Sequence, residues 1–189
     1  MRTAGFILVG GRSSRMGQDK ALLPWRSRTF LDHIADKVRA AAGSVTLVGN
    51  SAAYRDMHMD SLADLHPGLG PLAGIEAALS SGLGDLNLIV ACDLPLIETE
   101  WLTLLLATAQ SSEANCIIAK GEDGRIHPLC GVYRPECLPA VRKALEEGRL
   151  KLMDILGDLP AEYGPVAGPI WNVNTPEEWR RCQEFAHGR

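Results

Sequence analysis

The sequence has 189 residues, a length typical of one domain with enough apolar core to fold alone, so we expect residues 1–189 to form a single domain. Hydrophobic residues make up 46% and charged residues 22%, both ordinary for a globular protein, and the net charge of −4 argues against a nucleic-acid-binding protein, which would be basic. No apolar run approaches the roughly 20 residues of a membrane span, no signal peptide is evident, and five cysteines without a C-x-x-C pattern favour reduced thiols in the cytoplasm.

The first predicted element is a buried strand at Phe6–Val9, which leads directly into a glycine-rich, basic segment. Gly10 and Gly11 allow backbone N–H groups to approach phosphate oxygens, while Arg15 and Lys20 add positive charge. This combination predicts a site for the phosphates of a nucleotide. An exposed basic turn is the alternative, and it is less favoured because the glycines and cations are so concentrated just after the strand.

Two common phosphate motifs do not describe this segment. The P-loop has four residues between its glycines and then Lys at once, whereas five residues separate Gly11 from Gly17 and two more precede Lys20. The adjacent glycines also break the dinucleotide fingerprint G-x-G-x-x-G. Residues 68–73 do fit G-x-G-x-x-A, but no apolar strand leads into them, as that fingerprint requires.

Helical and strand patterns then alternate along the chain. A helix is expected over Phe30–Ala42 with Thr29 as its N-cap, followed by a strand over Val45–Val48. Another helix is expected from Pro71 to about Ser81. The alternation predicts an α/β fold in which helices cover a mostly parallel sheet.

Candidate nucleotide ligands lie around the second helix. The free N–H groups at its N-terminus could face a phosphate or a base. Asn50 follows a strand, and two roles stay open for it: it is a turn residue or it contacts a ligand.

The clearest buried strand, Leu86–Ala91, ends beside Asp93. Ligands of open α/β sheets bind beyond the carboxyl ends of the strands, and Mg²⁺ typically takes one or two carboxylates together with substrate phosphates. We therefore expect Asp93 to bind Mg²⁺. Capping of a helix over Glu98–Gln110 is the second-ranked role for this residue.

An antiparallel insertion is predicted after that helix. Strands over Cys116–Ala119 and Leu129–Tyr133 are separated by a short connection around Gly121–Gly124, which favours antiparallel pairing. Such an insertion is a usual place for a second substrate, so His127 is a candidate acceptor-binding residue. An amphipathic helix is expected over Glu136–Glu147.

The last predicted elements are a short strand at Ile170–Val173 and a helix whose capping box begins at Thr175. The capping box explains Thr175 structurally. Asn172 and Asn174 have no such explanation, and alternating asparagines at one strand end can read the amide and amine edge of a pterin.

Two motifs resemble those of one family. LVGGRSSRMGQDK at residues 8–20 is similar to the signature L-A-G-G-x-S-x-R-M-G-x-D-K of molybdenum cofactor guanylyltransferases, and NVNTPEE at residues 172–178 is similar to their closing motif. The resemblance implies a fold of the nucleotide-diphospho-sugar transferase type, a Rossmann-like three-layer sandwich with a mostly parallel sheet and an antiparallel insertion. It also implies GTP and molybdopterin or molybdenum cofactor as substrates, Mg²⁺ as cofactor, and proteins of molybdenum insertion and molybdoenzyme maturation as further partners.

The residues and the resemblance together assign individual roles. The expected nucleotide-binding residues are Leu8, Val9, Gly10, Gly11, Lys20, Asp60, Gly74 and Asp93. The resemblance implies Asp60, because a D-S-L-A-D stretch followed by G-P-L-A-G lines the guanosine site of the family and residues 60–64 and 70–74 match it. Asp64 is a weaker candidate, for which a solvated acid flanking a helix is the alternative. The expected catalytic residues are Arg15, Lys20 and Asp93, with Asp93 also holding the metal, and the expected acceptor-binding residues are His127, Asn172 and Asn174. Three alternatives stay open: a molybdopterin cytidylyltransferase, a sugar-1-phosphate nucleotidyltransferase, and a nucleotide-sensing module without catalysis on the same scaffold.

Overall fold

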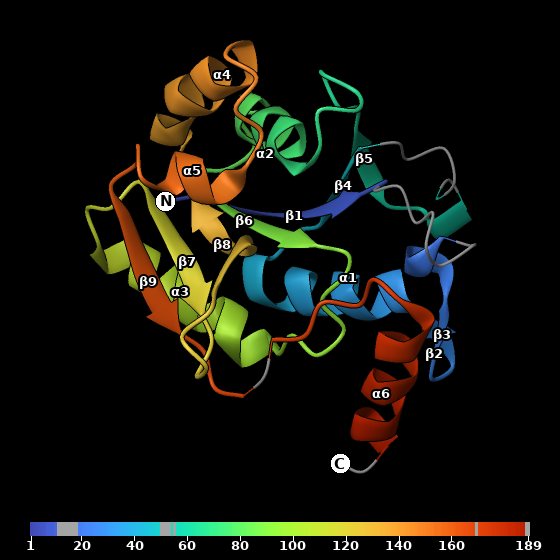
Figure 1. Ribbon diagram of the computed structural model, residues 1–189. Helices are drawn as coiled ribbons and strands as arrows, with labels where there is room; N and C mark the ends of the chain where they lie inside the picture. The colour runs from blue at the N-terminus through green and yellow to red at the C-terminus, as the bar shows by residue number, and fades with distance from the viewer. Residues whose placement is uncertain (11–18, 50–53, 55, 169, 188–189) are drawn as a thin grey trace.

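The computed structural model describes residues 1–10, 19–49, 54, 56–168 and 170–187. Within them, seven strands form one mixed sheet with helices on both of its faces (Figure 1). The strands of this sheet are β1 (Thr3–Val9), β4 (Thr46–Gly49), β5 (Asp60–Leu62), β6 (Leu86–Ala91), β7 (Cys116–Lys120), β8 (Ile126–Tyr133) and β9 (Ala161–Pro165). A separate small hairpin consists of β2 (Pro24–Trp25) and β3 (Arg28–Thr29).

The helices alternate with the strands along the chain, as the sequence patterns predict. The α-helices are α1 (Phe30–Ala42), α2 (Pro71–Ser80), α3 (Thr99–Ser111), α4 (Leu138–Glu146), α5 (Leu152–Leu156) and α6 (Pro176–His187). Among the described residues, η1 (Lys20–Leu22) and η3 (Pro135–Cys137) are single turns of 3-10 helix.

The sheet order is β5-β4-β1-β6-β8-β7-β9. β1 pairs in parallel with β4 and β6, whereas β8 is antiparallel to both of its neighbours, β6 and β7. The mostly parallel sheet and its antiparallel insertion are therefore confirmed. The chain runs outward from β1 through β4 to β5 and then crosses back to β6, so the strand order reverses beside β1, where ligands of open α/β sheets bind.

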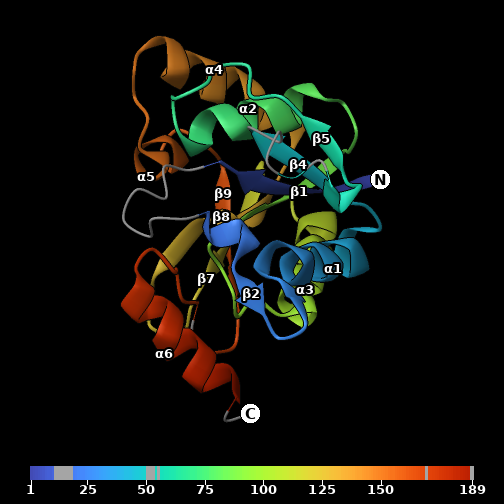
Figure 2. The ribbon, with the colours of Figure 1, turned by 90° about the vertical axis from the view of Figure 1, so that its right-hand side faces the viewer.

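Each face of the sheet has its own hydrophobic core. Ile7 and Val9 of β1 point into a cluster with α1 and α3, while Phe6 and Leu8 point into a second cluster with α2 and α4. Successive side chains of a strand point to opposite faces, and both faces are covered (Figures 1 and 2), which explains why the central strands read as continuous apolar runs. The three-layer architecture is confirmed.

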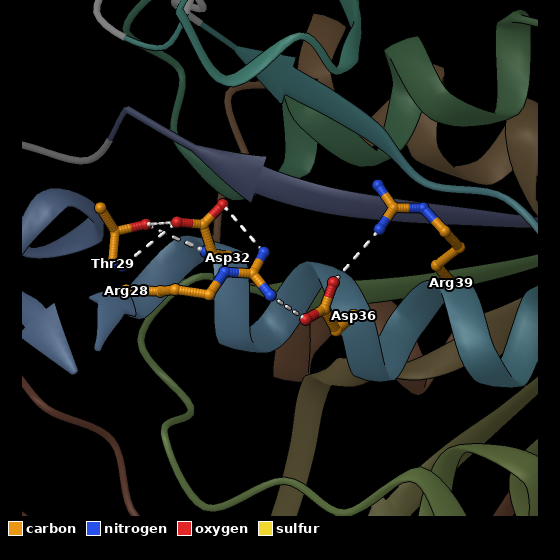
Figure 3. Close-up of polar contacts among 5 residues, drawn as sticks. All are labelled: Arg28, Thr29, Asp32, Asp36 and Arg39. Atoms are coloured by element: carbon orange, nitrogen blue, oxygen red, sulfur yellow. Dashed lines mark hydrogen bonds and ion pairs between the residues drawn. The ribbon is translucent and has the colours of Figure 1, made fainter. Parts of the chain in front are cut away.

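The start of α1 is fixed by local polar contacts (Figure 3). The Thr29 hydroxyl accepts from the Asp32 backbone N–H at 3.1 Å, and the Asp32 carboxylate accepts from the Thr29 backbone N–H at 3.1 Å, which is the reciprocal capping box. Arg28 forms ion pairs with Asp32 and Asp36, so its guanidinium lies over the first turns of the helix. The predicted bounds of α1 and its N-cap are confirmed.

The C-terminal helix belongs to the α1 and α3 face. Trp179 of α6 packs against Trp25 and Phe30, with ring centroids 5.3 and 5.4 Å apart. This contact anchors α6 to the layer that carries α1 (Figure 2). Among the described residues, no helix combines the length and apolarity that crossing a bilayer requires.

Some predicted elements differ in the structure. The strand expected at Ile170–Val173 is absent: this stretch joins no sheet, and the Val173 N–H instead donates to the Asp93 carbonyl at 2.9 Å. The helix expected over Glu136–Glu147 begins as the turn η3, and its α-helical part is α4. The edge strands β5 and β9 have mostly exposed or half-buried, polar sequences, so no apolar run predicted them.

Candidate active site

A cavity of about 570 Å³ lies at the carboxyl ends of the central parallel strands. Leu8 of β1 is level with Val48 of β4 on one side and Ala91 of β6 on the other, so these three strand ends meet at one edge of the sheet. The N-terminus of α2 closes another side. The lining residues are Leu8, Val9, Gly10, Lys20, Val48, Gly49, Asp64, Gly68, Gly70, Pro71, Gly74, Ala91, Cys92, Asp93 and Leu129.

The helix α2 packs closely against β1 because residue 74 is a glycine, which has no side chain. A Cβ built on Gly74 would lie 3.0 Å from Leu8 Cδ2, which is tighter than normal packing allows, so glycine lets the helix approach the strand closely. Gly70 is the N-cap of α2 and makes no side-chain cap hydrogen bond, and Pro71 occupies the first turn. The positive end of the helix dipole therefore borders the cavity.

Asp93 joins the two ends of the chain at this cavity. Its Oδ2 atom lies 3.6 Å from Lys20 Nζ and accepts a hydrogen bond from Asn172 Nδ2 at 3.2 Å. Lys20 Nζ also donates to the Val173 carbonyl at 3.4 Å and to Asn174 Oδ1 at 3.3 Å. The opening motif, the strand end at Asp93 and the closing motif, which the sequence analysis singled out separately, thus meet in one cluster.

The other carboxylate oxygen of Asp93 fits a hard cation. Oδ1 is buried and has no hydrogen-bond partner, and only 14% of the side chain is exposed. A buried unpaired oxygen is costly unless a ligand satisfies it. No group of three or more His, Cys, Asp or Glu residues that could hold a metal occurs in the part of the chain described here, so Asp93 would be supplemented by substrate phosphates and water, as Mg²⁺ allows.

Lys20 is presented by a short turn that Asp19 caps. Asp19 Oδ1 accepts from the Ala21 N–H at 3.0 Å, and Asp19 Oδ2 accepts from the Tyr54 hydroxyl at 2.5 Å. Tyr54 is 3% exposed, and burial together with the Asp19 contact raises the pKa of its phenol, so it remains a hydrogen-bond donor.

The two acidic candidates before α2 occupy different places. Asp64 lines the cavity, where its Oδ1 accepts from the His66 N–H at 2.9 Å. Asp60 is exposed at the start of β5, level with Thr46, and is not among the lining residues. The sequence analysis favoured Asp60, but the structure brings Asp64 to the cavity wall, because Asp60 lies at the amino end of its strand.

The thiol nearest the site is inert. Burial raises the pKa of Cys92 to about 12, so this lining residue stays protonated near neutral pH and is a poor nucleophile. All five cysteines are buried and free. This arrangement favours transfer chemistry without a covalent thiol intermediate.

A second cavity of about 350 Å³ shares the closing segment with the first site. It is lined by Arg125, Ile170, Trp171, Asn172, Val173, Asn174, Glu178 and Arg181. The predicted acceptor ligands Asn172 and Asn174 therefore face a space of their own beside Asp93. His127 lines neither cavity; it is half-buried on β8, and burial lowers the pKa of its imidazole.

Three residues that the sequence analysis selected lie outside the described residues. They are Gly11, Arg15 and Asn50.

A family model described as the MobA-like NTP transferase domain matches residues 5–163, which is most of the chain. The chain belongs to the MobA-like NTP transferases.

Curated relatives of this MobA-like transferase match over nearly its whole length. A protein of Flavobacterium johnsoniae named probable molybdenum cofactor guanylyltransferase is 36% identical over 92% of each chain. A protein of the same name from Carboxydothermus hydrogenoformans is 38% identical over 95% of this chain and 86% of its own.

A solved structure shows the same fold. The molybdopterin-guanine dinucleotide biosynthesis protein A of Archaeoglobus fulgidus superposes with a TM-score of 0.83 at 23% identity, covering 98% of this chain and 100% of its own. The predicted nucleotide-diphospho-sugar transferase type of fold is thereby confirmed for this MobA-like transferase.

The sequence analysis missed two residues of this MobA-like transferase that support elements bordering the site. Tyr54 donates a hydrogen bond to Asp19, the residue before Lys20, and nothing in its sequence neighbourhood marks it. Glu76 of α2 is 3% exposed and pairs with Arg142 of α4 at 3.1 Å, and its other oxygen lies 3.5 Å from His66 Nε2. Glu76 could have been selected from the sequence, because it is a charged residue in an otherwise apolar helix.

Proposed function

We propose that this chain transfers GMP from GTP to the phosphate of molybdopterin or molybdenum cofactor, releasing pyrophosphate and forming molybdopterin guanine dinucleotide. The observation that carries the proposal is the cluster of Asp93, Lys20 and Asn172 between the two cavities. The names of the curated relatives support the choice of guanine nucleotide and acceptor.

The transfer needs no general base. A phosphate monoester is already anionic near neutral pH, because its second pKa is about 6. One of its oxygens attacks the α-phosphorus of GTP, the bond from that phosphorus to the bridging oxygen breaks, and pyrophosphate leaves with the electron pair. Catalysis then rests on alignment and charge neutralisation.

Different residues are proposed to bind the triphosphate, to neutralise its charge and to hold the metal. Lys20 exchanges its contacts with Asp93 and Asn174 for oxygens of the triphosphate, while the N-terminus of α2 and the backbone at Gly10 face the nucleotide. Arg15 is proposed to stabilise the departing pyrophosphate. Asp93 would hold Mg²⁺, which supplies Lewis acidity at the phosphate oxygens when bound.

The acceptor is proposed to enter from the second cavity. Asn172 and Asn174 offer amide groups to a pterin, and Arg125 and Arg181 add positive charge on the same walls. An anionic acceptor bound there would lie beside Asp93 and leave the first cavity to the nucleotide.

A thermal-shift panel tests the choice of nucleotide. GTP with Mg²⁺ should raise the melting temperature more than CTP, ATP or UTP, because a ligand that binds the folded state stabilises it. Pyrophosphate release that requires both GTP and molybdopterin then identifies the reaction. A larger shift with CTP would support the cytidylyltransferase alternative, and release with a sugar 1-phosphate would support the sugar-nucleotide alternative; binding without release would leave a sensing module.

A further inference from the structure

We propose that Tyr54 is a positioning residue for triphosphate binding: through Asp19 it fixes the turn that presents Lys20. The inference rests on the proposed nucleotidyl transfer, because it assigns Lys20 to the triphosphate. It adds a residue that touches neither cavity in the described structure and that the motifs do not include.

The link from the core to Lys20 is short and continuous. Tyr54 is buried in the hydrophobic cluster of the α1 face, and its hydroxyl donates to Asp19 Oδ2 at 2.5 Å. Asp19 Oδ1 accepts from the Ala21 N–H at 3.0 Å, and the Asp19 carbonyl accepts from the Leu22 N–H at 3.1 Å. Asp19 therefore holds the start of η1 from two sides.

The turn needs such an anchor because it is too short to hold itself. η1 spans three residues, and a helical turn of that length gains little from its own hydrogen bonds. Its far end is tied by the Leu23 N–H, which donates to the Lys20 carbonyl at 3.2 Å. The flexible lysine side chain then starts from a backbone fixed at both ends, which reduces the entropy lost when it binds a phosphate.

The same contact keeps Asp19 from competing with substrate. Both of its carboxylate oxygens already accept hydrogen bonds, from Tyr54 and from Ala21. Lys20 accordingly pairs with Asp93 across the cavity rather than with its sequence neighbour, among the contacts that the structure describes. Removing the hydroxyl would free Asp19 Oδ2 to attract the ammonium away from the phosphates.

Tyr54→Phe tests the link, because it removes one oxygen and keeps the buried ring. We expect GTP to bind about tenfold more weakly, as for loss of a hydrogen bond to a charged group, with little change for GMP. The matched control is Tyr133→Phe, which removes another buried tyrosine hydroxyl, one that donates to the Pro128 carbonyl at 2.6 Å, and should leave the ratio of GTP to GMP affinity unchanged. Calorimetry on the full chain with Mg²⁺ measures both affinities.

A double-mutant cycle with Lys20→Ala separates positioning from a general loss of stability. In the Lys20→Ala background, Tyr54→Phe should change GTP affinity by less than about twofold, because the group it positions is gone. Additive losses, or an unchanged affinity ratio in Tyr54→Phe, would overturn the inference. If Tyr54→Phe fails to fold, Asp19→Asn tests the same link from the other side and should lower the affinity ratio likewise.

The outcomes also distinguish this inference from the proposed function. A wild-type protein that binds GTP no better than GMP overturns both. A wild-type protein that prefers GTP and loses that preference in Lys20→Ala, but not in Tyr54→Phe or Asp19→Asn, retains the proposed function and loses only the role of Tyr54.

Discussion

At the scale of single residues, Asp93 shows how one carboxylate can have two environments. Its Oδ2 atom is neutralised by Lys20 and Asn172, while its Oδ1 atom is buried without a partner. The residue therefore carries an unsatisfied oxygen at the edge of the cavity. Such a group costs folding free energy, and the proposed binding of metal and substrate would offset that cost.

Replacing Asp93 should separate catalysis from stability. Asp93→Ala and the isosteric Asp93→Asn should each reduce turnover at least about a hundredfold, since an electrostatic contribution to the transition state is lost. The melting temperature should change little, because loss of the contacts with Lys20 and Asn172 opposes removal of the unpaired buried oxygen. Pyrophosphate release and thermal unfolding measure the two effects. An Asp93→Ala protein with normal turnover would remove the metal from the proposed chemistry.

At the scale of elements, α2 is held near its middle by an ion pair between a buried glutamate and a partly exposed arginine. Glu76 is 3% exposed, and Arg142 reaches it from α4, so the helix that borders the nucleotide cavity is tied to its neighbour in the same layer. Arg142 also donates to Ser80 Oγ at 3.2 Å. The position of the helix terminus at the cavity thus depends on a contact made about a turn and a half further along the helix.

Arg142→Met should destabilise the fold, because it leaves the buried Glu76 carboxylate without its main partner. We expect a loss of about 2 kcal/mol in the free energy of unfolding. The neighbouring Lys143→Met is the control: Lys143 makes an exposed pair with Glu147 at 4.0 Å, worth below about 0.5 kcal/mol. Urea unfolding of both variants provides the comparison, and equal losses would mean that the buried pair contributes nothing special.

The elements that the sequence predicted well are those whose signals are local. α1 has a cap and an apolar stripe, and its bounds agree with the prediction over Phe30–Ala42. β5 and β9 were missed because edge strands need no apolar run, and Ile170–Val173 has strand composition but no strand partner. An apolar composition indicates that a segment is buried, whereas strand pairing depends on which segments lie beside it in the folded chain.

The residues of the candidate site also fall into two groups: those that local sequence signals identified and those that they did not. Lys20, Asp93 and Asn172 could be selected from motifs and from their places at the ends of predicted elements, and the structure brings them together. Asp64 was ranked below Asp60 and Tyr54 was not selected, because their places at the cavity wall and beside Asp19 depend on contacts between segments that only the folded chain creates. Sequence patterns identify chemical groups at strand ends, and tertiary packing decides which of them share a cavity.

At the scale of the whole molecule, one histidine links stability to pH. His33 of α1 is half-buried against Trp25, with ring centroids 5.7 Å apart. Burial, with Lys37 and Arg26 nearby, lowers the pKa of His33 from 6.5 to about 4. Between these values the unfolded chain binds a proton that the folded chain does not, so the folded state loses stability as the pH falls.

We therefore expect the free energy of unfolding to decrease by about 2 kcal/mol between pH 6.5 and pH 4.5 through this group. His33→Gln should remove that part of the pH dependence while leaving the loss below pH 4, to which carboxylates such as Asp32 contribute. Urea titrations at several pH values measure this pH dependence of the free energy of unfolding for both proteins. A His33→Gln protein with the same slope over this window would assign the effect to another group.

The docking of residues 172–174 against Asp93 and Lys20 also has a consequence for synthesis of the protein. The ribosome makes both cavity-forming halves of the sheet before it makes the asparagines that complete the cluster. A chain that stops before residue 172 would therefore lack Asn172 and Asn174, and with them the side-chain contacts that join this segment to Asp93 and Lys20.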